Sequence, residues 1–514
     1  MCELEFNLND KELFPFCVRN SERLGFLGPN TRETLAKLAH KVETSQLTSA
    51  DGSDLVQLWK WLIIDAIHAL KAHDKREKAW LEKDTDVPWI KASQIGARQQ
   101  NVYGAESLFG FFEEFTKFEQ LLYGTERHYR DHVAHPIRVW MTGIKIIMGW
   151  GGIERLEFDD NAGAGEISEV EKWAAWTIMS LCHDLGYPLE KAHKVTDLVD
   201  KMMEFFGNIS TGRYRYSFQV HHQSLIETML RAVASKLVKV DVSMPQDVRP
   251  PHADQPLKDA QGADLKGSRD SGSEMSGEQG KGVRDLRFTT VIQPKYYAKF
   301  SHSFEDFQHG IISVLVLLKC LVYFMEMDFD FSGRGSLGAE DARQFHIRRE
   351  ILRAIASHTC PEVYHLKLNT PSFLLIVCDD LQEWGRPSVA SLILQEDPGS
   401  SRDGQDAKVC VGTCTVNRLS CSIEYPSHGK GEQKVKAEFG RYHKLLRAAL
   451  DDRVRSFVFD WKVTQQDSEG KPLELHFNYD SNRAPFEELV IHKNDEDVTA
   501  MLFNEKDKFE ANKT

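Results

Sequence analysis

The chain has 514 residues, of which 41% are hydrophobic and 27% charged, and a formal net charge of −13. This length exceeds one ordinary hydrophobic core and predicts a globular protein of two or three domains. The acidic balance excludes a generally basic surface for nucleic acid or an anionic membrane, although a local basic groove is compatible with it.

The cysteines and the N-terminus indicate a reducing compartment. The first ten residues are acidic and contain no hydrophobic core of a secretion signal. Nine cysteines, an odd number, are scattered through the chain, a usage that favours reduced thiols and predicts a cytoplasmic protein. Cys410, Cys414 and Cys421 do not have the spacing of a zinc cluster, and we interpret them as strand and loop residues.

Residues 1–122 are predicted to be helical. Thr31 to Val42 forms an amphipathic surface helix, whereas Leu55 to Leu70, capped by Ser53, is apolar almost all round. Charged residues interrupt that second helix, so a buried soluble helix is expected and no membrane span. The helix Ala105 to Tyr123 carries a phenylalanine stripe without alternating basic residues. We therefore expect the stripe to pack against the next domain instead of stacking on bases.

An adjacent histidine and aspartate end a helix near the middle of the chain. The apolar spacing predicts a helix from Glu169 to Cys182, which Gly186 and Pro188 stop just after His183 and Asp184. Two ligand-type side chains at a helix end are well placed to hold one cation. His135, at the start of a helix that runs to about Trp150, is expected to point toward the same core.

A change of composition marks an insertion after the next two predicted helices, Lys191 to Phe206 and His221 to Val240. Between Ser243 and Asp285 glycine, proline, serine and charged residues dominate, and no aromatic residue occurs. Such a segment cannot bury enough apolar surface to order itself, so we expect a flexible insertion. A strand-like run follows from Arg287.

Three later helices each offer one more candidate ligand. These are His309 on a helix to Tyr323, His358 on the apolar face of a helix from His346, and Asp379 within Phe373 to Trp384. A carboxylate buried without a partner costs several kcal/mol, so a cation is expected beside Asp379.

These residues resemble the HD superfamily of metal-dependent phosphohydrolases over about Tyr123 to Arg386. His135, the His183-Asp184 pair and Asp379 match the family pattern in order, and His309 (as His-Gly-x-x-Ser) and His358 look like the extra histidines of two-metal members. The resemblance implies an HD-type enzyme whose metal ligands are His135, His183, Asp184, His309, His358 and Asp379. His132, His221, His222 and His302 are alternatives for these positions.

The ligand types indicate one or two divalent ions, Mn, Fe, Mg, Co or Zn, and the absence of cysteine argues against a structural zinc site. In the two-metal case Asp184 bridges, and Asp184, His309 and His358 are the candidate catalytic residues. Lys191 and Arg386 are candidates for binding phosphate oxygens, with a surface or interhelix salt bridge as the equal alternative for both.

The C-terminal part, 391–514, changes character. Alternating apolar residues predict strands at 419–425, 457–463 and 473–479, with a helix from Glu432 to Leu450. We expect a small α+β appendage with one helix over an antiparallel sheet. It could sense a ligand, pair with another subunit in a homo-oligomer, or cap the site entrance. The predicted fold class is thus mainly α, with an N-terminal helical region (1–122), an HD core (123–390) and this appendage.

The leading functional hypothesis is a metal-dependent phosphohydrolase that cleaves a phosphodiester or phosphoanhydride of a nucleotide. One alternative is a dNTP triphosphohydrolase with a single metal, and another is a nucleotide-binding sensor without turnover. The sequence lacks an HHExxDGxGYP run and has Tyr187 where cyclic-di-GMP-hydrolysing relatives have lysine. That activity is therefore not expected.

Overall fold

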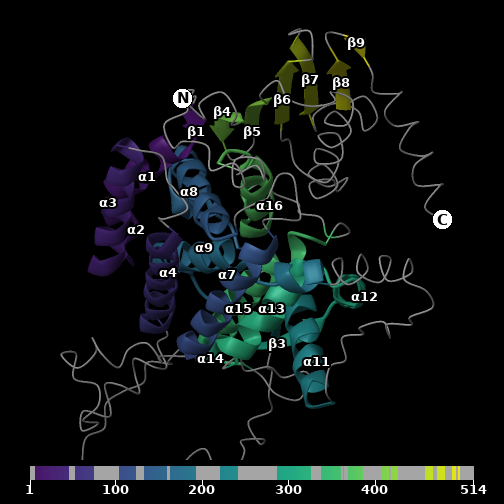
Figure 1. Cartoon of the computed structure of the whole chain (residues 1–514). Coiled ribbons are helices and arrows are strands. Elements are labelled where there is room, and N and C mark those ends of the chain that lie inside the picture. Colours follow the sequence, from purple (N-terminus) through teal and green to yellow (C-terminus); the bar gives the residue numbers. More distant parts are fainter. Residues whose placement is uncertain are drawn as a thin grey trace, which may run out of the picture.

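The protein is mainly helical, with one large and one small β-sheet (Figure 1). The computed structural model describes residues 6–44, 52–73, 104–122, 132–158, 162–192, 220–240, 286–325, 337–360, 363, 369–385, 407–415, 418–425, 458–466, 472–480, 489–493 and 496–497. The helices are α1 (Asp10–Arg19), α2 (Ser21–Leu24), α3 (Pro29–Thr44), α4 (Gly52–Ala72), α7 (Ala105–Leu122), α8 (Ala134–Gly149), η4 (Ile153–Arg155), α9 (Glu169–Cys182), α11 (Val220–Ala234), α12 (Pro294–Glu305), α13 (His309–Cys320), α14 (Val322–Met325), α15 (Ala339–Ser357) and α16 (Pro371–Leu381). The strands are β1 (Phe6–Leu8), β2 (Ser235–Val240), β3 (Arg287–Ile292), β4 (Lys408–Thr415), β5 (Arg418–Tyr425), β6 (Val458–Gln466), β7 (Pro472–Asp480), β8 (Leu489–Lys493) and β9 (Glu496–Asp497).

Aromatic contacts join the N-terminal helices to the centre of the molecule. Trp59 on α4 is fully buried, and its indole N–H donates to the carbonyl of Leu181 on α9 at 2.9 Å. On its other side Trp59 stacks on Phe112 of α7, with ring centroids 4.0 Å apart, and Phe112 stacks on Phe115. Phe112 and Phe115 of the phenylalanine stripe thus pack in the core. That the stripe packs against the next domain stays a prediction, as the domain division itself does.

Helix α9, which leads to the His-Asp pair, is fixed at its start by a capping box. The hydroxyl of Ser168 accepts from the Glu171 N–H, and the Glu171 carboxylate accepts from the Ser168 N–H at 2.9 Å. The same carboxylate forms a buried ion pair with Arg343 on α15 at 2.6 Å. This ion pair fixes α9 and α15, two helices that carry candidate ligands, relative to each other.

Asp10 on α1 ties together the helices that carry His135 and Asp379. Its carboxylate takes two hydrogen bonds from Arg138 on α8, at 2.9 and 2.7 Å, and one from the indole of Trp384 after α16, at 3.0 Å. Arg138 also donates to the carbonyl of Gly385. The first helix of the chain therefore helps to set the spacing of α8 and α16.

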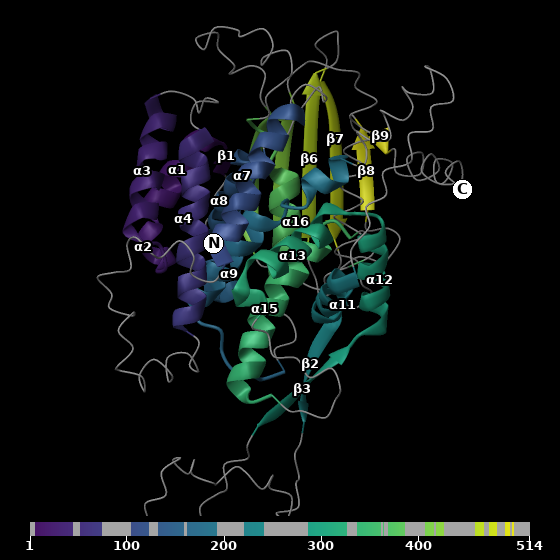
Figure 2. The ribbon, with the colours of Figure 1, turned by 60° about the horizontal axis from the view of Figure 1, so that its bottom comes forward.

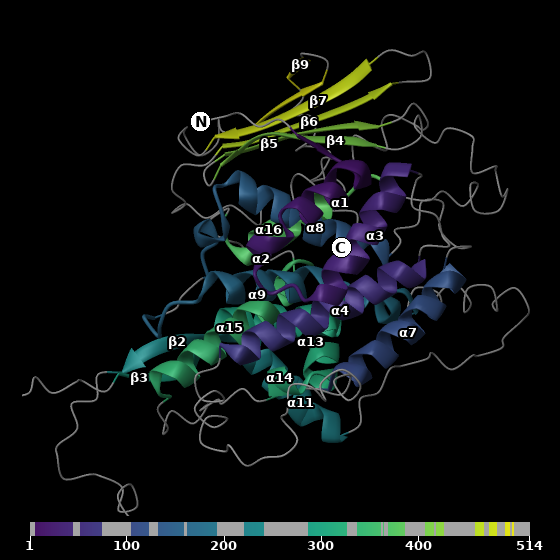
Figure 3. The same cartoon turned by 90° about the vertical axis from the view of Figure 1, so that its left-hand side faces the viewer.

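The larger sheet has the order β1-β4-β5-β6-β7-β8-β9 and forms a layer over α1, α8 and α16 (Figure 3). The prediction of a wholly antiparallel sheet was wrong, because β5 and β6 pair in parallel, with Leu419 opposite Phe459. A parallel pair requires a crossover connection, and the predicted helix 432–450 falls in that connection, outside the described residues. Strand β1 was not predicted either; it pairs with β4, with Phe6 opposite Val411.

The smaller sheet is a two-stranded antiparallel ribbon, β2 and β3, that extends beyond the helices (Figure 2). The prediction of one helix from His221 to Val240 was wrong at its end: α11 stops at Ala234, and the chain continues as β2. The run Ser235-Lys-Leu-Val-Lys-Val alternates in burial, as a strand requires, and Leu237 is buried. The two strands that flank the predicted insertion are thus paired with each other.

Other sequence predictions hold to within a few residues, except that α15 begins seven residues before His346. The insertion 243–285 and most of the predicted helix 191–206 lie outside the described residues, and the division into three domains stays a prediction. Among the described helices, none is both long and apolar enough to cross a membrane.

Candidate metal centre

Two helices end in the same way, each with a buried histidine. His183 is the C-cap residue of α9, and His358 is the C-cap residue of α15. In each case the ring Nδ1–H donates to a carbonyl three residues earlier, that of Ser180 at 2.8 Å and that of Ile355 at 2.6 Å. The last carbonyls of a helix have no partner within the helix. Each ring satisfies one of them and is left with its Nε2 facing inward.

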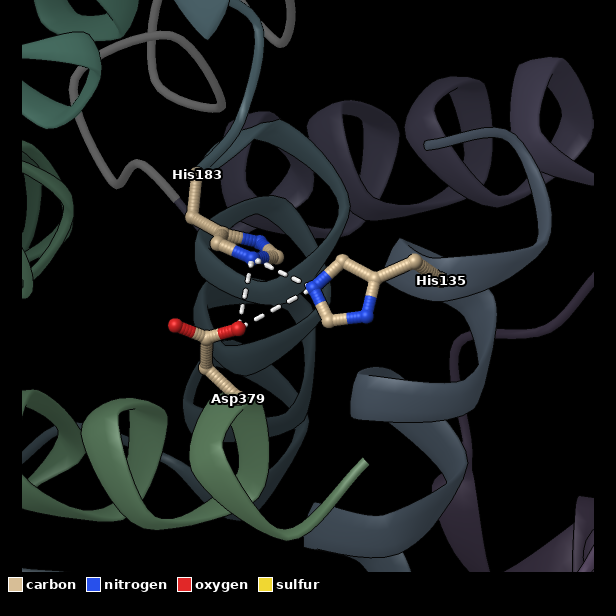
Figure 4. A group of neighbouring side chains, drawn as sticks. All are labelled: His135, His183 and Asp379. Atoms are coloured by element: carbon tan, nitrogen blue, oxygen red, sulfur yellow. Dashed lines mark hydrogen bonds and ion pairs between the residues drawn. The ribbon is translucent and has the colours of Figure 1, made fainter. Parts of the chain in front are cut away.

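His135, in the first turn of α8, lies beside His183. Its Nδ1 lies 2.7 Å from the Oε1 of Gln382, and the amide nitrogen of Gln382 donates to the carbonyl of Trp384 at 2.6 Å. That second bond fixes the amide orientation, so Oε1 is the acceptor and Nδ1 carries the proton. The Nε2 of His135 lies 3.2 Å from the Nε2 of His183 and 3.1 Å from the Oδ1 of Asp379 on α16 (Figure 4).

The two carboxylate oxygens of Asp184 face different pairs of histidines. Oδ2 lies 3.4 Å from the Nε2 of His135 and 3.2 Å from the Nε2 of His183. Oδ1 lies 3.2 Å from the Nε2 of His309 and 3.7 Å from the Nε2 of His358. Asp184 therefore stands between two groups of ligand-type atoms.

His309, the first residue of α13, is held by Glu190. The ring Nδ1–H donates to the Oε2 of Glu190 at 2.7 Å, and the backbone N–H of His309 reaches the same oxygen at 3.3 Å. Its Nε2 lies 3.2 Å from the Nε2 of His358. As in the other three histidines, the nitrogen that points to the centre is Nε2.

The distances between these atoms fit bound divalent ions. Ligands at 2.0–2.2 Å from one ion stand roughly 3 to 3.6 Å from one another. The separations within the His135, His183, Asp379 and Asp184 Oδ2 group are 3.1 to 4.0 Å, and those within the His309, His358 and Asp184 Oδ1 group are 3.2 to 3.7 Å. When their inward nitrogens carry lone pairs, these rings repel one another and the carboxylates, and a cation at each centre removes that repulsion.

The charge states of the ion-free cluster lead to the same inference. Burial favours neutral His309, but its hydrogen bonds to Asp184 and Glu190 outweigh burial and raise its pKa to about 9. Burial lowers the pKa of His358 to about 4. Burial alone would raise the pKa of Asp184, yet His183, His309 and His358 together hold it well below its usual range. Without an ion, these shifts favour a protonated His309 beside Asp184, and a divalent cation can replace that proton.

The candidate ligands differ in their access to solvent. The side chains of His183 and His358 are 0% exposed, that of His135 is 1% and that of Asp184 is 6%. His309 is 20% exposed and Glu190 is 23% exposed. The cluster is therefore open to solvent on the side of His309.

The remaining candidate residues lie in several places. His132 is buried with its ring against Tyr187, centroids 3.8 Å apart, and His302 is exposed beside Asp306. Lys191 is half-buried with its Nζ 4.9 Å from the centroid of Tyr187, whose ring lies 5.9 Å from that of His309. Lys191 thus lies near the open side.

Two further sets of candidates were named from the sequence. Arg386 and the side chains of His221 and His222 lie outside the described residues. Cys410, Cys414 and Cys421 lie on β4 and β5, in accord with their interpretation as strand residues. Neither of the two potential metal-binding groups found among the described residues contains a cysteine.

Sequence reasoning missed the residues that orient the ligands, Glu190 and Gln382. Glu190 follows Asp184 by six residues, and Gln382 follows Asp379 by three residues. Such supporting residues can be any hydrogen-bond acceptor and have no characteristic spacing. The signal that the sequence did offer was that both acceptors lie close in sequence to a predicted ligand.

The fold and the site together define a mainly helical protein with a buried cluster of histidines and aspartates able to hold metal ions. No protein-family model, curated protein or solved structure matches the chain.

Proposed function

We propose that the protein is an HD-type, metal-dependent phosphohydrolase that uses two divalent ions to cleave a phosphodiester or phosphoanhydride bond of a nucleotide. The observation that carries the proposal is the position of Asp184, whose two oxygens face separate histidine pairs. An aspartate shared in this way is suited to hold two ions side by side, the arrangement that clamps the attacking and leaving oxygens of an in-line displacement at phosphorus.

Bound divalent ions would supply Lewis acidity toward a phosphoryl oxygen and lower the pKa of a bound water. The protein residues hold the ligand atoms in place and keep solvent from most of the cluster. The imidazoles that face the centre donate through Nδ1 to fixed acceptors, so that Nε2 is the nitrogen each ring presents for coordination. Substrate approaches from the side where His309 is exposed, with Lys191 as the candidate for contacting phosphate oxygens.

A one-metal dNTP triphosphohydrolase is the second candidate. In this candidate His135, His183, Asp184 and Asp379 hold the one ion, and the ligand atoms of His135, His183 and Asp379 lie close enough together for that. In that case His309 and His358 would serve as acid and phosphate contact instead of ligands.

The test is a panel of nucleotides incubated with the protein and Mn²⁺ or Mg²⁺. The panel contains dNTPs, cyclic mono-, di- and oligonucleotides, ppGpp, and single-stranded DNA and RNA. We expect metal-dependent release of phosphate or a shorter nucleotide from at least one substrate class. Asp184→Ala should abolish hydrolysis and metal binding while the protein stays folded, since many buried helices other than this site form the core. Unchanged turnover by a metal-stripped Asp184→Ala protein, or binding of nucleotides without any product, would refute the proposal; the latter result would favour a sensor.

A further inference from the structure

Two acceptors of different charge support the two halves of the cluster. On one side the neutral amide of Gln382 accepts from Nδ1 of His135, and on the other side the carboxylate of Glu190 accepts from Nδ1 of His309. The two nitrogens of an imidazole ring point away from each other. Because Nε2 of His309 faces the centre and Nδ1 donates to Glu190, Glu190 lies behind the ring and does not face the centre. Its contact with the metal site therefore runs through the ring.

We propose that Glu190 is a positioning residue that sets the affinity of one ion only, the ion held by His309, His358 and Asp184 Oδ1, and that this outer ion exchanges with solvent while the inner ion stays bound. The inference rests on the two-ion site of the proposed function. It names the residue that controls how that site is loaded.

The charge of Glu190 is expected to change how strongly His309 binds an ion. A carboxylate that accepts the Nδ1 proton makes the imidazole more basic at Nε2 and fixes its orientation, and loss of such a partner lowers metal affinity by about 10- to 100-fold. Glu190 is anchored by two donors of the same residue, the ring and the backbone N–H of His309, at the start of α13. Its position is thereby tied to that of the ligand it supports.

The difference in burial explains why the two ions should exchange differently. The inner group is lined by His135, His183 and Asp379, whose side chains are at most 8% exposed. The outer group includes His309, which is 20% exposed beside the 23% exposed Glu190. Water and free ions therefore reach the outer group first. A site with fewer protein ligands and more solvent relies more on the strength of each ligand.

The experiment is a Mn²⁺ titration of the metal-stripped full-length protein, with free Mn²⁺ followed by electron paramagnetic resonance. The wild-type protein should bind two Mn²⁺ ions, one more tightly than the other. Glu190→Gln keeps the hydrogen-bond acceptor and removes the charge, so it should weaken the weaker ion by about 10-fold or more and leave the tighter ion within about twofold. The matched variant Gln382→Leu should weaken the tighter ion instead.

Unchanged affinity of the weaker ion in Glu190→Gln, or weakening of both ions alike, would overturn the proposal. A cooperative unfolding transition in the presence of EDTA shows that a variant is folded without its ions. Glu190→Ala provides a second variant, for which a loss at least as large is expected at the weaker ion. Nucleotide hydrolysis is assayed separately: a selective shift in Mn²⁺ affinity without any hydrolysed nucleotide would uphold the role of Glu190 and reject the phosphohydrolase.

Discussion

Ser313 on α13 holds the turn that contains the His183-Asp184 pair. Its hydroxyl lies 2.7 Å from the carbonyl oxygen of His183, to which it donates, and accepts from the N–H of Gly186 at 2.7 Å. The same hydroxyl lies 2.8 Å from the carbonyl of His309, one turn earlier on α13. One buried side chain thus links the backbone of a ligand from each half of the cluster.

Ser313→Ala should lower the free energy of unfolding by about 1–3 kcal/mol, because it leaves the buried N–H of Gly186 and a buried carbonyl without their partner. Urea unfolding of the ion-free protein measures this loss. Ser301→Ala is the control: that hydroxyl bonds only one turn back to Tyr297 within α12, and its removal should change stability by no more than about 0.5 kcal/mol. Equal effects of the two substitutions would contradict the linking role of Ser313.

Gly186 permits the close approach of that turn to α13. A Cβ at this position would lie 2.3 Å from the carbonyl oxygen of His309 and 2.8 Å from the backbone nitrogen of Ser313. Gly186→Ala should therefore cost about 1–3 kcal/mol and displace the ligand pair from α13. At Gly110 on α7 an added Cβ meets nothing within 4 Å, so Gly110→Ala should stabilise by up to about 1 kcal/mol. Thermal unfolding of both variants, together with bound Mn²⁺, tests this contrast.

His358→Ala distinguishes one metal from two. If His358 is a ligand of the second ion, its removal should halve the bound metal and lower turnover by orders of magnitude, while substrate affinity changes less. In the one-metal case metal content stays constant, and the rate falls by roughly 10²- to 10⁴-fold through a lost acid or phosphate contact. Metal analysis of protein purified in parallel gives the answer. His302→Ala is the control, since this exposed ring lies beside Asp306 and outside the ligand group. A wild-type stoichiometry near one rules out the two-metal site.

Asp65 on α4 predicts a pH dependence of stability away from the metal centre. Burial raises its pKa above the usual value, although its carboxylate accepts from Thr31 Oγ1 and from the Gly28 N–H at 2.7 Å. Because the folded pKa is the higher one, folding favours the protonated carboxyl, and this contribution to stability is lost as the pH rises through the folded pKa. Asp65→Asn should therefore gain stability over wild type as the pH is raised from about 4 to 7.

Asp54 is the control of opposite sign for that experiment. Hydrogen bonds from Lys37 and Lys41 lower its pKa. Asp54→Asn should therefore lose stability relative to wild type as the pH rises toward about 4, the ordinary carboxyl value, and the difference should stay nearly constant at higher pH. Urea unfolding at several pH values measures both differences, and a shift in the same direction for both variants would show that burial does not govern Asp65.

Deleting 243–285 and joining the ends with a short Gly/Ser linker should leave the core folded. The flanking strands β2 and β3 are antiparallel, with Val240 opposite Arg287, so the linker only has to close a hairpin. Closing a shorter loop favours the folded state by at most about 2 kcal/mol. The unfolding midpoint and the monodispersity of the deletion variant measure the result, and aggregation would show that the deleted segment covers part of the core.

The sequence was informative where the chemistry of a residue coincides with a helical period. His135, His358 and Asp379 lie on the apolar faces of amphipathic helices, and the adjacent pair His183-Asp184 follows a helix stop, so their convergence could be predicted. Glu190 and Gln382 were not predicted, because an acceptor for an imidazole N–H has no required spacing and closeness in sequence to a ligand is only a weak signal. The end of α11 was missed because Leu237 and its neighbours suit either a helix or a short strand, and the pairing with β3 decides between them. The parallel pair β5–β6 depends on long-range pairing that local patterns do not encode.

The pairing of β1 with β4 has a consequence for synthesis. Phe6 is synthesised roughly 400 residues before its partner Val411. At about 5–20 residues per second the first strand waits about 20 to 80 s for its neighbour. During that interval an unpaired strand edge is exposed to other chains. Asp10, bound by Arg138 in the finished protein, lies two residues after this strand, and α8 is made early enough to dock the N-terminal segment long before the sheet is complete.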